Sequence, residues 1–88
     1  MPYLYEIEKP SLFTEKGSES YIKGRDWVLK ILKKAGAFNS GAYMAGPSSP
    51  GTSWGYLAEL DRMLEVGDIA EVTGPGVAGQ CRVFISSK

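Results

Sequence analysis

The sequence predicts one small α+β domain in which three helices are followed by a β-hairpin. Two observations support this fold class. Apolar residues recur at the spacing of a helix face as far as Val66, and after Gly67 the pattern changes to the alternation of a strand. Glycines also stand where the predicted helices end, which is typical of helix C-termini.

The N-terminal segment 3–9 alternates apolar and polar side chains, which is typical of a strand, and Pro10 ends it. We therefore expect one extra N-terminal strand. The chain divides into a strand-and-loop extension over residues 1–17 and a folded domain over residues 18–88.

The first helix is predicted over residues 19–35, with Ser18 as its N-cap and Gly36 as the residue that ends it. Winding this segment at about 100° per residue separates an apolar face from a charged face. The apolar face comprises Tyr21, Val28, Ile31, Leu32 and Ala35. The charged face comprises Lys23, Asp26, Lys30, Lys33 and Lys34.

A short second helix is predicted over residues 41–45, with Asn39 or Ser40 as its N-cap. The third helix covers residues 54–66 and ends at Gly67. Its inner face comprises Leu57, Leu60 and Leu64, flanked by Tyr56 and Met63. Its outward face comprises Trp54, Ala58, Asp61, Arg62 and Glu65.

Two strand-like runs, residues 68–73 and 80–86, flank a glycine-rich segment, which predicts a β-hairpin. In the second run, Cys81, Val83 and Ile85 fall on one side, which we expect to be the buried side. Cys81 is then a buried structural thiol.

The composition argues against several classes of function. With one cysteine the chain forms no internal disulfide, which fits a reducing cytoplasm. It has no histidine, the commonest general base and zinc ligand, so we expect no catalytic residues, no metal and no cofactor. No apolar run approaches the roughly 20 residues of a membrane span, so we expect no membrane partner.

Two familiar motifs occur literally, and both are better explained by structure. Residues 74–79 spell G-x-G-x-x-G, but a strand follows them where a dinucleotide site needs a helix. Residues 51–55 spell G-x-S-x-G, but a nucleophile elbow needs a histidine, so Ser53 is expected to cap a helix. Asp61 and Glu65, one helical turn apart, are expected to lie on a solvated face.

The order helix, short helix, turn, helix and hairpin resembles the winged helix-turn-helix superfamily of DNA-binding domains. Residues 36–40 resemble the entry to the helix-turn-helix, and residues 56–69 resemble the end of a recognition helix that leads into the first wing strand. Residues 83–85 resemble the returning wing strand. The resemblance covers residues 18–87 and does not reach the level of a named family.

This resemblance implies binding of double-stranded DNA, with the third helix in the major groove and the wing beside it. By position, the implied DNA-contacting residues are Ser49, Thr52, Ser53, Trp54, Ala58, Arg62, Gln80, Arg82 and Lys88. Further residues that could contact the DNA backbone are Lys23, Lys30, Lys33 and Lys34. A transcriptional regulator or accessory DNA-binding factor of this kind is expected to act as a homodimer.

The charges of the C-terminal half leave a second interpretation open. Residues 51–88 carry Arg62, Arg82 and Lys88 against five acidic residues, so the expected recognition helix is net acidic, whereas DNA affinity comes chiefly from basic side chains. The alternative is a winged-helix module that binds another protein through Trp54 and Tyr43, because aromatic anchors dominate protein interfaces.

Overall fold

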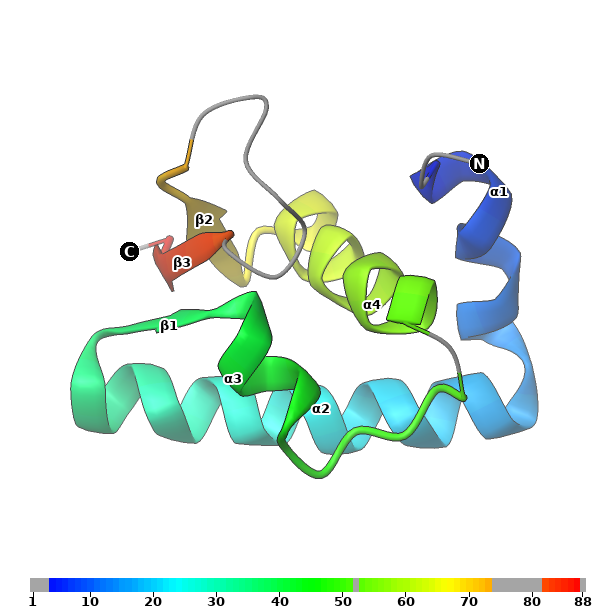
Figure 1. The fold of residues 1–88 in the computed structure, drawn as a ribbon, viewed down its shortest axis with the longest axis horizontal. Helices are drawn as coiled ribbons and strands as arrows, with labels where there is room; N and C mark the ends of the chain where they lie inside the picture. The colour runs from blue at the N-terminus through cyan, green and yellow to red at the C-terminus, as the bar shows by residue number, and fades with distance from the viewer. Residues whose placement is uncertain (1–3, 52, 74–81, 88) are drawn as a thin grey trace.

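The computed structural model describes residues 4–51, 53–73 and 82–87. Among these residues it contains four α-helices and a three-stranded antiparallel sheet, which confirms the α+β class (Figure 1). In chain order the elements are α1 (Tyr5–Glu8), the 3-10 helix η1 (Lys9–Phe13), α2 (Glu15–Ala35), β1 (Ala37–Asn39), α3 (Ser40–Met44), α4 (Ser53–Val66), β2 (Ile69–Glu71) and β3 (Val83–Ser86).

The N-terminal segment is helical, so the predicted strand over residues 3–9 is wrong. Helical winding places Tyr5 and Lys9 one turn apart, and both side chains reach Glu65 on α4. A strand would place Ile7 on the same side as Tyr5, but Ile7 is 61% exposed. Pro10 lies in the first turn of η1, where its missing N–H is not needed. The tertiary contact with α4 therefore outweighs the local alternation.

Helix α2 begins four residues earlier than the sequence predicted. Its N-cap is Thr14, whose side-chain oxygen accepts a hydrogen bond from the Gly17 N–H at 3.0 Å, and not Ser18. The Ser18 hydroxyl donates to the carbonyl of Leu12 instead. Gly36 ends the helix as predicted, with a φ of 82° that favours glycine.

Helices α3 and α4 confirm the predicted second and third helices to within a residue or so at each end. The Asn39 side chain caps α3 by accepting from the Ala42 N–H at 2.7 Å. One assignment on α4 is wrong: Ala58, expected to face outward, is 0% exposed. The reason is that α1 and η1 pack against α4, so this helix is covered on more than one side.

The sheet has the strand order β1-β3-β2, with β3 in the middle. The sequence did not indicate β1, which is three residues long and pairs Phe38 with Phe84. These two rings stack at 5.3 Å between centroids. The buried side of β3 is that of Phe84, at 0% exposure, and not that of Val83 and Ile85 as predicted. Residues 83–85 are all apolar, so alternation could not select the buried side.

The predicted position of Cys81 and the glycine-rich segment 74–79 lie outside the described residues. Within the described part of the chain, no helix combines the length and the hydrophobicity that crossing a membrane requires.

A core of seven side chains joins the helices to the sheet. It comprises Val28, Phe38, Tyr43, Leu60, Met63, Ile69 and Phe84. Trp27 covers its edge, with its ring against Phe38 and Tyr43. Helix α2 lies along one side of the molecule; the sheet, α4 and α1 lie to one side of it, and α3 with the segment that follows crosses in front of it (Figure 1).

Glu59 is buried in this core although it is an acid, and it is 0% exposed. Its carboxylate accepts hydrogen bonds from three hydroxyls: Ser20 at 2.6 Å, Tyr43 at 2.7 Å, and Ser48. Burial raises the pKa of the Tyr43 hydroxyl, and the Glu59 carboxylate raises it further, so Tyr43 remains a donor. The cluster links α2, α3, the segment that follows α3, and α4, and so fixes how these elements sit against one another.

Gly24 gives the Tyr43 hydroxyl its space on α2. A Cβ atom at this position would lie 1.9 Å from Tyr43 Oη. We expect Gly24→Ala to lower the free energy of unfolding by about 1–3 kcal/mol through overpacking, despite the better helix propensity of alanine. Chemical denaturation measures the loss. The same substitution should cost less in a Tyr43→Phe background, and an equal cost in both backgrounds would contradict the proposed clash.

Candidate nucleic-acid interface

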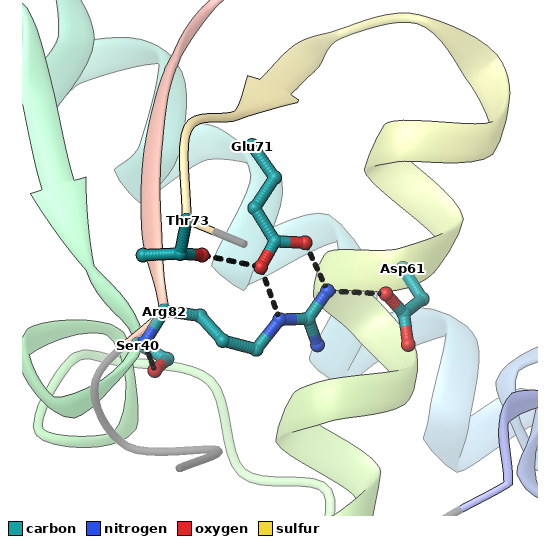
Figure 2. Close-up of polar contacts among 5 residues, drawn as sticks. All are labelled: Ser40, Asp61, Glu71, Thr73 and Arg82. Carbon is teal, nitrogen blue, oxygen red and sulfur yellow. Dashed lines mark hydrogen bonds and ion pairs between the residues drawn. The ribbon is translucent and has the colours of Figure 1, made fainter. Parts of the chain in front are cut away.

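Arg82, one of the two arginines expected to contact DNA, is bound within the chain. It directly precedes β3, and its side chain extends past the Glu71 side chain to Asp61 on α4 (Figure 2). Nε and Nη2 donate to the two carboxylate oxygens of Glu71 at 3.0 and 2.8 Å, and Nη2 also donates to Asp61 at 2.7 Å. The side chain is 14% exposed. The guanidinium is therefore committed to two carboxylates.

The surroundings of Arg82 hold it in this position. The Thr73 hydroxyl donates to Glu71 at 2.5 Å, and the Arg82 backbone exchanges hydrogen bonds with Ser40 (Figure 2). The guanidinium also lies 5.2 Å from the centroid of the Phe84 ring. Burial lowers the pKa of Arg82, but the hydrogen bonds to Glu71 and Asp61 raise it more, so the net shift is upward. The hydrogen bond from Arg82 lowers the pKa of Glu71.

Arg62, the second arginine, is also paired within the chain. Its Nη1 donates to Glu65 at 2.7 Å, and its guanidinium lies 5.2 Å from the centroid of the Phe13 ring. Glu65 also accepts from Tyr5 at 3.0 Å and from Lys9 at 2.9 Å. These hydrogen bonds, that of Lys9 foremost, lower the pKa of Glu65 to about 2. Glu65 lies on an exposed face as expected, whereas Asp61 is partly buried, and both form ion pairs.

Helix α4 has little free surface for a DNA groove. Among the described side chains of α4, only those of Glu65 and Val66, in its last turn, are exposed. A recognition helix must present a row of side chains to base edges, and this face of α4 is packed against α1 and η1.

The other residues predicted to contact DNA or protein are dispersed over the molecule or lie outside the described residues. Trp54 is half-buried, and Tyr43, expected to join it in a protein interface, is 1% exposed and belongs to the core. Ser49 is exposed, and its N–H donates to the Ser20 hydroxyl. Those outside the described residues are Thr52, Gln80, Lys88 and the side chain of Ser53.

The lysines of α2 are the basic residues that remain accessible. Lys23, Lys30, Lys33 and Lys34 are exposed, and no salt bridge found among the described residues involves them. The structure thus separates two kinds of cation. The arginines close to α4 are paired, and the lysines on the outer side of α2 are open to solvent.

Sequence reasoning missed two apolar residues on the same side of α2. Ile22 is 58% exposed and Leu29 is 42% exposed. They stand seven residues apart, which is two helical turns, so they lie on one face. The signal was present in the sequence, because at about 100° per residue both side chains lie roughly 100–120° around the helix from the buried Val28, outside the apolar face.

Shallow depressions flank this apolar pair. Ile22 and the exposed Phe13 line one of about 210 Å³. Leu29 and Lys33 line another of about 580 Å³, between α2 and the end of the sheet. Arg25 and Asp68, paired at 2.8 Å, also line the larger depression. The outer side of α2 therefore combines exposed apolar side chains with charged ones.

No group of three histidine, cysteine or acidic side chains in the described residues could hold a metal ion. The buried carboxylate of Glu59 is held by hydroxyl donors in the core. Comparison with protein-family models, with curated proteins and with solved structures gives no match.

The commitment of Arg82 predicts a structural role. We expect Arg82→Ala to lower the free energy of unfolding by about 1–3 kcal/mol, because it leaves Asp61 and Glu71 close together without a cation, with partial exposure moderating the loss. Urea denaturation measures this. Arg62→Ala is the matched control, and its loss should be smaller because its ion pair is open to solvent. An equal or larger loss for Arg62→Ala would contradict the assignment.

The lowered carboxylate pKa values predict acid sensitivity. Because the folded-state pKa of Glu71 lies below its usual 4.5 and that of Glu65 is about 2, their stabilisation is complete above about pH 4.5. It is lost as the pH falls through the folded-state pKa values. Thermal melting from pH 7 to pH 2 should show this decline. The difference in Tm between the wild type and Arg82→Ala should shrink over the same range, and a constant difference would contradict the prediction.

Proposed function

We propose that the chain is a non-enzymatic winged-helix module that acts by binding protein. The element order α2, β1, α3, α4, β2, β3 supports the winged-helix assignment, with α4 in the place of the recognition helix. In such a domain the fold alone does not determine whether the partner is DNA or protein; that depends on the side chains that α4 and the strands present.

The observation that carries the proposal is the pairing of the two arginines within the chain. Binding to DNA draws its affinity from cations that neutralise phosphates. Arg82 already forms ion pairs with Glu71 and Asp61, and Arg62 forms one with Glu65. To contact a phosphate, either arginine must first give up these partners. The arrangement therefore favours a partner that does not depend on them.

The surface that best suits a protein partner is the outward side of α2. We define the α2 outer face as the exposed residues Glu15, Glu19, Ile22, Asp26, Leu29, Lys30 and Lys33. Ile22 adjoins the exposed Phe13 through the smaller depression, and Leu29 lines the larger one. Single exposed apolar residues are common on protein surfaces, but a row of them beside a depression is typical of an interaction site.

Site-specific photocrosslinking tests this proposal. A photoreactive amino acid at Ile22 or Leu29 should give protein crosslinks in cells that express the chain. The control is the same amino acid at Ile7 on α1, which is at least as exposed as Ile22. Equal crosslinking from Ile7 and Ile22, or none from Ile22 and Leu29, would overturn the proposal.

Duplex DNA is the second candidate partner, favoured by the open lysines of α2. Under this alternative, DNA binding at low salt should weaken in a variant with Lys30, Lys33 and Lys34 changed to alanine. Its salt dependence should fall by roughly one unit of slope per lysine that contacts a phosphate. Fluorescence anisotropy with a labelled duplex measures both. An unchanged affinity for DNA would exclude these lysines as the contact. A loss of DNA affinity in an Arg82→Ala variant that is still folded would instead indicate contact through the wing.

A further inference from the structure

We propose that the α2 outer face binds the same face of a second copy of this chain, with the two α2 helices antiparallel. The inference rests on the proposed function in one respect, namely that this face binds protein. It adds the identity of the partner and the direction of packing.

The α2 outer face is accessible along the whole helix. Helix α2 has 21 residues, so it is about 30 Å long and matches the longest dimension of the molecule, 30 Å. Figure 1 shows α2 along one side of the domain, with α3 and the segment that follows it crossing in front of it, and the residues that define the outer face are all exposed. A second helix of equal length could therefore lie against it.

The exposed residues along this face have the spacing of a helix–helix seam. The series is Glu15, Glu19, Ile22, Asp26, Leu29 and Lys33, with steps of four, three, four, three and four residues. All six are exposed. This is the a/d spacing by which two helices pack side by side. The two apolar members, Ile22 and Leu29, stand third and fifth in the series on either side of Asp26, so they would meet in either direction of packing.

The charges select the antiparallel direction. The acidic residues Glu15 and Glu19 stand at the N-terminal end of the face, and Lys30 and Lys33 stand at its C-terminal end. In an antiparallel pair each acidic end meets a basic end, whereas a parallel pair would place like charges together. No salt bridge found within the described residues occupies these four side chains.

The face is thus complementary to itself under a two-fold axis, as a symmetric dimer requires. The zero net charge of the chain adds no overall repulsion between copies. Asp26 in the middle limits the apolar area, so we expect an association that dilution reverses.

A charge-swap experiment tests the partner and the direction together. One variant carries Glu15→Lys and Glu19→Lys, and the other carries Lys30→Glu and Lys33→Glu. By sedimentation velocity, each variant alone should dimerise at least about tenfold more weakly than the wild type, because like charges then meet. An equimolar mixture should recover dimerisation to within about threefold of the wild type, since the basic face of one variant meets the acidic face of the other.

A second variant leaves the helix ends unchanged. Ile22→Ser should weaken the dimer about tenfold or more, while Ile7→Ser should leave it unchanged. Circular dichroism should show the same helix content in all these variants. A strict monomer for the wild type at about 1 mM would overturn the inference. So would a mixture of the charge variants that stays as monomeric as each alone.

The photocrosslinking result separates this inference from the proposed function. If Ile22 crosslinks to a different protein while the chain sediments as a monomer, the inference fails and the proposed function stands. If Ile22 gives no protein crosslink at all, both fail.

Discussion

The rest of the structure depends on the position of Arg82 between Glu71 and Asp61. A guanidinium can bind two carboxylates at once because its donors lie in one plane, whereas an ammonium is a point charge. With Nε and Nη2 on Glu71, and Nη2 also on Asp61, Arg82 joins β2 and the start of β3 to α4. These contacts fix the sheet against α4, the helix that the family resemblance would place in the major groove of DNA. The same contact that stabilises the fold removes a cation from the surface.

Helix α4 is the element around which the other helices pack. On one side the buried Glu59 carboxylate binds hydroxyls from α2 and α3, and on another Glu65 binds Tyr5 and Lys9 of the N-terminal segment. A chain of 88 residues has little apolar surface to bury, so specific polar contacts are expected to contribute much to the choice of one arrangement. The burial of Ala58 follows from this, since a helix that is covered on several sides has no outward face at that position.

Sequence patterns predicted the elements whose signals are local, and missed those set by distant contacts. The end of α2 at Gly36 was predicted correctly, and the cap of α3 is Asn39, one of the two residues predicted for it; both features depend on neighbouring residues. The N-terminal segment alternates like a strand, but its helical form is stabilised by a contact with Glu65, about 60 residues away along the chain. No local pattern reveals that contact, so the predicted strand was wrong. Likewise, the sequence shows that Arg82 follows a glycine-rich segment but not that Asp61 and Glu71 converge on it. Strand β1 is too short for any periodicity to reveal.

The distribution of charged side chains along α2 also affects which partner this helix would bind. Within the described residues, each arginine belongs to an ion pair, and the lysines at the C-terminal end of α2 belong to none. The α2 outer face is therefore dipolar along its length, acidic near Glu15 and Glu19 and basic near Lys30 and Lys33. A DNA backbone is uniformly negative, so it would attract one half of this face and repel the other. An antiparallel copy of the same helix carries the opposite gradient and attracts both halves. Charge pattern and length thus favour a protein helix over a phosphate backbone on α2.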